Sequence, residues 1–131
     1  MKKIYTLLTL ATLLVAMSSC GHDYYYNSDL LGRWEKVSVI ENGYEYELER
    51  GEYEQYIFYN NGTGIYVNEF GTRVDFYWDE YGYDRVNIRF SDGITEYLYY
   101  SFDRGDLILW ETASHRNGRV FQYTGGGGGR W

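Results

Sequence analysis

The chain has 131 residues, with twelve lysines and arginines against nineteen aspartates and glutamates. A formal charge of −7 argues against a nucleic-acid partner, because a surface that binds nucleic acid must neutralise phosphates with basic side chains. Aromatic residues make up 21% of the chain, and seventeen residues are tyrosines, which favour strands.

The N-terminal segment has the pattern of a secretory signal. Lys2 and Lys3 supply a positive start, and residues 4–17 form an apolar run of signal-peptide length. This run is too short for a permanent membrane-spanning helix. We therefore predict that residues 1–19 are removed, which leaves 112 residues with ten basic and nineteen acidic side chains. That length is enough for one domain with a modest core.

Cys20 is the single cysteine of the chain, so it has no partner for an internal disulfide. The sequence Met17-Ser18-Ser19-Cys20 resembles the lipobox of bacterial lipoproteins. This resemblance implies that the cysteine sulfur carries a diacylglyceryl group and that Cys20 becomes the first residue. We expect lipidated Cys20 to anchor the protein in the cell envelope, in the outer membrane, because several acyl chains on one residue hold lastingly. The alternative is ordinary cleavage after Ser18, which leaves a free thiol.

The rest of the chain divides into three parts. Residues 20–29 form a polar tether, residues 30–124 form a β domain, and residues 125–131 form a flexible glycine-rich tail. In the β domain, short runs of strand-forming residues alternate with turn signals roughly every ten to twelve residues, which is typical of an antiparallel sandwich or barrel. We predict nine strands, at residues 34–40, 44–49, 53–59, 63–70, 73–78, 85–90, 94–102, 107–112 and 119–124.

Three motifs carry a resemblance to a known family. Leu31-Gly32-Arg33-Trp34 is a G-x-W motif, residues 56–66 join an aromatic strand to a Gly-Thr-Gly return, and residues 102–111 join a turn to an L-x-L strand. Together they resemble the lipocalin-like domains of small Bacteroidetes lipoproteins. The resemblance implies an all-β fold, a small antiparallel up-and-down barrel of about eight or nine strands. The strand spacing alone leaves a β-sandwich as the alternative. The resemblance further implies that Gly32 and Trp34 pack across one barrel end, with Arg119 as the partner of the Trp34 ring.

We predict no catalytic residue, metal site or cofactor. His22 lies close to the expected anchor and His115 lies in a polar turn, so neither is placed like a catalytic base. The aspartates of residues 79–84 and 103–106 are explained by turn chemistry, since neither loop has the spacing of a calcium loop. The many carboxylates leave a glycosidase-like pair open. We nevertheless expect a protein that is not an enzyme.

The aromatic residues give two functional hypotheses. Tyr56 and Phe58 share one face of their strand, and Tyr97 and Tyr99 share one face of theirs, so these four are the predicted ligand or partner contacts. The first hypothesis is a non-enzymatic lipoprotein that binds a small apolar or glycan-like ligand among such rings. The alternative is a protein-interaction or inhibitor lipoprotein of the cell envelope, whose barrel interior is filled by its own side chains.

Overall fold

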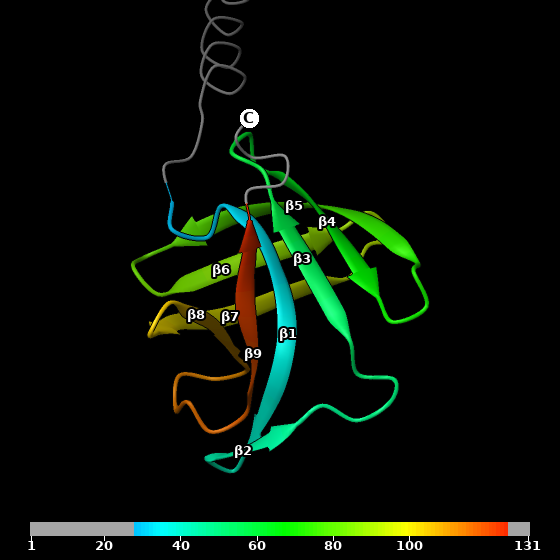
Figure 1. Cartoon of the computed structure of the whole chain (residues 1–131). Coiled ribbons are helices and arrows are strands. Elements are labelled where there is room, and N and C mark those ends of the chain that lie inside the picture. The colour runs from blue at the N-terminus through cyan, green and yellow to red at the C-terminus, as the bar shows by residue number, and fades with distance from the viewer. Residues whose placement is uncertain (1–27, 126–131) are drawn as a thin grey trace, which may run out of the picture.

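The computed structural model describes residues 28–125, which include all of the predicted β domain. Cys20, the predicted signal and residues 20–27 of the tether lie outside this range, as do residues 126–131. No helix long and apolar enough to cross a membrane occurs between residues 28 and 125. These residues form nine strands (Figure 1): β1 (Gly32–Glu41), β2 (Tyr44–Glu47), β3 (Glu54–Phe58), β4 (Thr63–Asn68), β5 (Arg73–Tyr81), β6 (Arg85–Phe90), β7 (Thr95–Asp103), β8 (Asp106–Trp110) and β9 (Gly118–Gly125).

The strands form one closed antiparallel barrel with one additional strand. Each strand from β3 to β8 pairs with the next along the chain, and β1 closes the ring by pairing with both β3 and β9. β2 pairs with the second half of β1, from Ser38 to Glu41, and projects from that end of it in Figure 1. The prediction of a small antiparallel up-and-down barrel is therefore confirmed. A single closed sheet replaces the two packed sheets of the alternative sandwich.

Five predicted strand ends differ from the structure by two or three residues: β1 begins at Gly32, β2 ends at Glu47, β4 ends at Asn68, β5 ends at Tyr81 and β8 ends at Trp110. β5 continues through Asp79 to Tyr81, which we expected in a loop, because Glu80 points inward and accepts a hydrogen bond from the Tyr100 hydroxyl at 3.0 Å. β2 ends at Glu47, two residues earlier than predicted. Its last partner is Ser38, and beyond that point β1 pairs with β3 instead.

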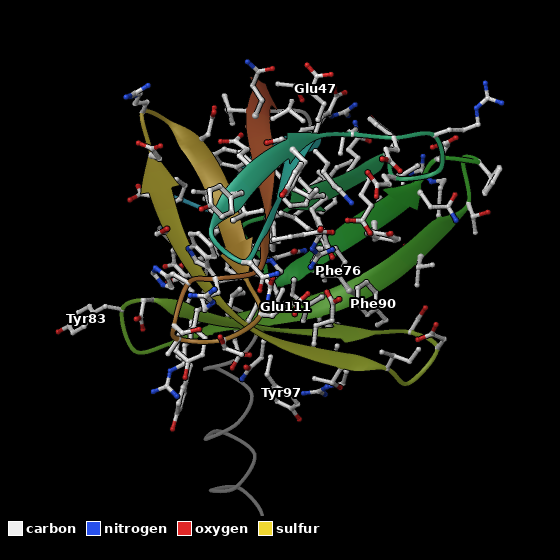
Figure 2. All side chains as sticks on the ribbon, turned by 90° about the horizontal axis from the view of Figure 1, so that it is seen from below. Glu47, Phe76, Tyr83, Phe90, Tyr97 and Glu111 are labelled. Carbon is white, nitrogen blue, oxygen red and sulfur yellow. The ribbon has the colours of Figure 1, made fainter. Side chains whose placement is uncertain are left out.

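We call the end of the barrel at which β1 begins the base and the opposite end the mouth. Large side chains fill the interior toward the base. The Phe58 ring lies 5.4 Å from the Phe76 ring and 5.2 Å from the Trp78 ring, and all three are buried. Figure 2 shows Phe76 inside the barrel and Tyr97 pointing away from it. The interior is thus packed with rings here, as expected for an eight-stranded barrel.

Gly32 and Trp34 lie at the base. The Trp34 ring lies 5.2 Å from the Tyr123 ring, and its indole N–H donates to the Leu30 carbonyl at 2.8 Å. A side chain at Gly32 would overlap the Tyr123 ring, and the positive φ of +120° there also favours glycine. Gly32 therefore lets the base close tightly around Trp34.

Arg119 is not the partner of Trp34, which corrects the expectation from the lipocalin-like resemblance. In the β1–β9 ladder Arg119 is opposite Val39, whereas Trp34 is opposite Tyr123. Five residues along a strand correspond to about 16 Å, so Arg119 lies toward the mouth. There it finds its acidic partners, Glu54 and Glu96, which a buried guanidinium requires.

A second, smaller apolar cluster lies on the outer side of β8 and β9. Ile108, Trp110 and Val120 form it, and the loop between these strands covers it. The His115 ring from that loop stacks on Trp110 with ring centroids 4.5 Å apart. The residue opposite Trp110 is Gly118, where any side chain would overlap the indole. These contacts explain how an apolar strand such as β8 can be buried on both faces.

Candidate functional site

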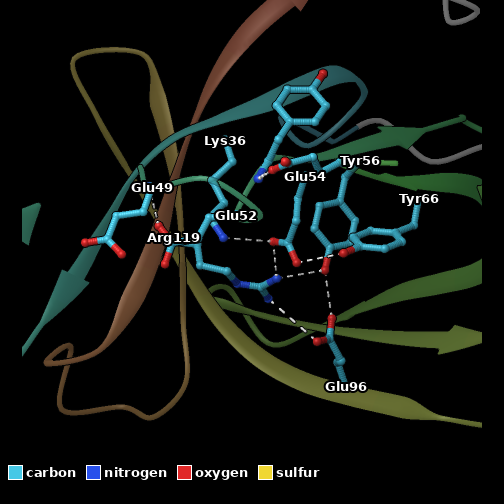
Figure 3. Close-up of polar contacts among 10 residues, drawn as sticks. Lys36, Glu49, Glu52, Glu54, Tyr56, Tyr66, Glu96 and Arg119 are labelled. Carbon is cyan, nitrogen blue, oxygen red and sulfur yellow. Dashed lines mark hydrogen bonds and ion pairs between the residues drawn. The ribbon is translucent and has the colours of Figure 1, made fainter. Parts of the chain in front are cut away.

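A cluster of polar side chains lies inside the barrel at the mouth (Figure 3). Its members come from five strands that are far apart in the sequence and that the barrel brings together. We call it the polar cluster, and it consists of Lys36 on β1, Glu54 and Tyr56 on β3, Tyr66 on β4, Glu96 on β7 and Arg119 on β9.

Arg119 is the centre of the polar cluster. Its Nη1 donates to Glu54 Oε1 at 2.8 Å and to the Tyr56 hydroxyl oxygen at 3.1 Å. Its Nη2 lies 3.7 Å from Glu96 Oε2. The guanidinium also lies 5.6 Å from the centroid of the Tyr56 ring, within cation–π range. One cation thus holds two carboxylates and a phenol in place.

The remaining contacts complete a network. The Tyr66 hydroxyl donates to Glu54 Oε2 at 2.7 Å, and Lys36 Nζ lies 3.5 Å from Glu54 Oε1. The Tyr56 hydroxyl donates to Glu96 Oε1 at 2.9 Å. Glu54 therefore has three partners, while Glu96 has two. Buried polar groups are stable only when they are paired in this way.

The pKa values of these groups follow from burial and pairing. Burial acts to raise the pKa of Glu54, but Arg119, Tyr66 and Lys36 outweigh it and hold that pKa below its ordinary value of 4.5. Burial raises the pKa of Tyr56 well above its ordinary value, and the neighbouring carboxylates add to this effect against the opposition of Arg119. Burial also raises the pKa of Tyr66, and its hydrogen bond to Glu54 adds to the rise. The two tyrosines therefore stay protonated and Glu54 stays ionised at neutral pH.

A cavity of about 240 Å³ opens beside the polar cluster. Three of its lining residues are apolar: Val74, Phe90 and Ile94. The others are Glu54, Tyr56, Tyr66 and Glu96 from the polar cluster, and Asp92. The volume is below the roughly 300–1,000 Å³ of sites for drug-sized ligands, so it suits a small ligand or one end of a longer one.

The four predicted contact residues do not form one site. Tyr56 belongs to the polar cluster, whereas Phe58 is fully buried in the ring packing toward the base. Tyr97 is 71% exposed on the outside of the barrel, and Tyr99 is half-buried against the outer apolar cluster. The first pair, Tyr56 and Phe58, thus lies on the inner face of the sheet, and the second pair, Tyr97 and Tyr99, lies on its outer face.

Sequence reasoning did not single out Glu54, Glu96 or Lys36. The available signal was alternation, since Glu96 shares a face of its strand with Leu98 and Glu54 shares one with Tyr56. A carboxylate on the apolar face of a strand predicts an interior charge that needs a partner.

Within residues 28–125, no three His, Cys, Asp or Glu side chains are arranged so that they could hold a metal ion. The chain matches no known family model, no curated protein and no solved structure. Any assignment of function therefore depends on the geometry of the site.

Proposed function

We propose that the protein is a lipid-anchored binding protein of the bacterial cell envelope whose barrel mouth holds a small amphipathic ligand. One observation carries this proposal: the lining of the cavity at the mouth combines apolar side chains with fixed hydrogen-bonding groups. Such a combination is the usual form of a small-molecule site, in which apolar surface supplies affinity and a few polar groups supply orientation.

The charges around the cavity favour a ligand that donates hydrogen bonds. In the polar cluster Lys36 and Arg119 balance Glu54 and Glu96, and Asp92 adds one further negative charge. The Glu96 side chain is 30% exposed and has fewer partners than Glu54, so its carboxylate is the more available acceptor. The proposed ligand is therefore a small molecule with an apolar body and one or more hydroxyl groups.

The proposed role is binding without chemistry. An acid–base catalyst needs a pKa near the working pH. In the polar cluster, Glu54 has a lowered pKa and the two tyrosines have raised pKa values. These groups keep their protonation state around neutral pH, which suits fixed donors and acceptors.

Native mass spectrometry of the full-length chain, purified from the envelope of a bacterial host, tests the proposal. We expect an additional mass that dissociates on denaturation and whose fragments identify the ligand. The Ile94→Asp variant replaces an apolar residue of the cavity lining by a charge and should lose this mass. Phe70→Asp, at an exposed position in the neighbouring hairpin outside the cavity lining, is the matched control and should keep it. No mass beyond that of the acylated chain, even after incubation with envelope lipid extract, would contradict a ligand site.

A second candidate function is a protein-interaction role, and β2 favours it. All four residues of this strand are exposed, with Tyr44 and Tyr46 alternating with Glu45 and Glu47. Tyrosines at a projecting acidic strand suit a partner with a basic surface. Chemical cross-linking in intact envelopes should trap that partner. Replacing both tyrosines by serine should abolish the cross-link and leave the ligand mass unchanged, whereas an unchanged cross-link would exclude β2 as the contact.

A further inference from the structure

A second surface with the features of a binding site lies on the outside of the barrel, away from the mouth cavity. We call it the outer tyrosine face. It consists of the outward-pointing residues of three strands: Tyr77, Asp79 and Tyr81 on β5, Arg85, Asn87 and Arg89 on β6, and Thr95, Tyr97 and Tyr99 on β7. Tyr77, Tyr97 and Tyr81 are 63%, 71% and 55% exposed. Figure 2 shows Tyr97 projecting from the barrel wall.

The register of the strands spaces the three exposed rings evenly. Tyr77 is opposite Arg89. Two residues further along β5, Asp79 is opposite Asn87, and Asn87 is in turn opposite Tyr97 on β7. Two residues beyond that, Tyr81 is opposite Arg85. Two residues along a strand correspond to about 6.6 Å, so Tyr77 and Tyr81 stand about 13 Å apart with Tyr97 at an intermediate level.

Two depressions separate these rings. One has a volume of about 200 Å³ and includes Tyr77, Asp79 and Arg89 in its lining, and the other, of about 280 Å³, includes Tyr81, Arg85 and Tyr99. Asn87 and Tyr97 line both. Neighbouring depressions that share a ring and an amide form two adjacent subsites on one continuous surface.

The polar groups of this face are available for a ligand. Between residues 28 and 125, no hydrogen bond or ion pair engages the side chains of Asp79, Asn87 or Arg89, in contrast to the fully connected polar cluster. The Arg85 guanidinium is held by stacking, 4.5 Å from the Tyr81 ring centroid and 5.6 Å from that of Tyr99. Arg85 thus holds the Tyr81 and Tyr99 rings, while the polar groups of Asp79, Asn87 and Arg89 stay unpaired within the described part of the chain.

We propose that the outer tyrosine face binds a linear saccharide, with one pyranose ring in each of the two depressions. The C–H faces of a sugar are apolar and pack on aromatic rings, while its hydroxyls need the bidentate donors and acceptors that amide, carboxylate and guanidinium groups provide. Tyrosine and arginine are also common at protein interfaces. Two neighbouring depressions that share Asn87 and Tyr97 match consecutive sugar rings better than the single central pocket of a protein interface.

The charge of the face widens the class of saccharide to acidic ones. Arg85 and Arg89 exceed Asp79 by one positive charge, although the whole chain carries a formal charge of −7. A carboxylated or sulfated sugar would gain from this local excess. A neutral sugar would rely on the rings and on Asn87.

A glycan array probed with the full-length chain tests this proposal. The chain should be held in a detergent without a sugar headgroup, so that the detergent does not occupy the face. We expect retention on a set of oligosaccharides of two or more sugars, and Tyr97→Ala should weaken binding to the best of them about tenfold or more by titration calorimetry. Tyr44→Ala is the matched control, because Tyr44 is 70% exposed on a different strand, and it should leave the affinity unchanged.

The other outcomes overturn the proposal. No retention on the array, or retention that Tyr97→Ala does not weaken, would exclude a saccharide site on this face. Loss of glycan binding in Ile94→Asp but not in Tyr97→Ala would place the sugar at the mouth, and so would support the ligand site there instead. Loss of a protein cross-link in Tyr97→Ala, with no glycan bound, would show that the face binds a protein.

Discussion

At the scale of single residues, the polar cluster depends on Arg119. This side chain is 19% exposed and satisfies Glu54, Tyr56 and Glu96 from one position. An interior carboxylate that loses its cation must either be protonated or draw water into the barrel. The positions of these side chains at the mouth therefore depend on the positive charge of Arg119, which arginine keeps at every physiological pH.

The first prediction concerns the loss of this cation. Arg119→Met keeps the length of the side chain but leaves the carboxylates of Glu54 and Glu96 without their shared partner. We expect the free energy of unfolding to fall by about 3 kcal/mol, measured by urea denaturation. Arg73→Met, at an exposed position on β5, is the control and should change stability by less than about 0.5 kcal/mol. Equal midpoints for Arg119→Met and the wild type would show that the network does not stabilise the fold.

The second prediction concerns acid stability. The pKa of Glu54 is lower in the folded state than its ordinary value of 4.5, because Arg119, Tyr66 and Lys36 outweigh the effect of burial. Folding is therefore stabilised above that ordinary value, and this contribution is lost as the pH falls through the folded-state pKa.

Thermal unfolding across the acid range measures this effect. We expect the melting temperature of the wild type to fall more steeply between about pH 5 and pH 3 than that of Glu54→Gln. The variant should be the less stable protein at pH 7, where the wild-type carboxylate is ionised and paired. Parallel curves for the two proteins would mean that Glu54 has the same pKa in the folded and unfolded chains.

Alternation in the sequence places Glu96 inward, but it does not reveal which cation meets it. Arg119 follows Glu96 by twenty-three residues, and the two approach only because the barrel curves β7 and β9 toward each other across the interior. The lipocalin-like motif directs attention to Trp34 as the partner of Arg119. The register of β1 with β9 places Arg119 opposite Val39 instead. The register of two strands that close a barrel depends on the register of every strand pair between them, so local sequence does not predict it.

At the scale of elements, the turn signals of the sequence suffice to predict nine strands. Asn42-Gly43 forms the β1–β2 turn, with positive φ at both residues as a type I′ turn requires. The premature end of β2 was not predictable, because it reflects the point at which β1 exchanges β2 for β3 as its neighbour. Local patterns therefore predict that a strand exists more reliably than they predict its end.

The third prediction concerns the close packing of β4 against the core. A methyl group on Gly64 would overlap the Phe76 ring and the Ile57 carbonyl. We expect Gly64→Ala to lower the free energy of unfolding by about 1–3 kcal/mol, since overpacking forces rings and backbone to shift. Urea denaturation measures the change.

A double variant shows whether the Phe76 ring is the cause. Phe76→Leu removes the ring edge nearest to Gly64, so the double variant should be more stable than the sum of the two single effects predicts. Simple additivity would attribute the destabilisation to the backbone of Ile57 alone.

At the scale of the whole molecule, the barrel divides into regions with different tasks. The base is packed with rings, the mouth holds a polar network beside a cavity, and the wall of β5 to β7 exposes tyrosines. The proposed membrane attachment through Cys20 would leave both of the proposed binding regions in the part of the chain that follows the tether.

The fourth prediction concerns this attachment. In a bacterial host that processes lipoproteins, metabolic labelling with a radioactive fatty acid should label the wild-type chain, and the label should stay with the membrane fraction. Cys20→Ala should lose the label and enter the soluble fraction, because the acyl chains supply the lasting attachment. A labelled Cys20→Ala protein would contradict lipidation at this residue.

The pairing of β1 with β9 also has a kinetic consequence. The first strand of the barrel needs the last one to complete its hydrogen bonding, so closure waits until Gly118–Gly125 has been synthesised. A pairing between such distant segments slows folding, because the chain loses loop-closure entropy before the contact forms. Until then the growing sheet carries two unpaired edges, which are the parts of a β-protein most prone to join other chains. A chain that stops before β9 would keep those edges permanently, and it would be removed by proteolysis or aggregate rather than persist as a smaller barrel.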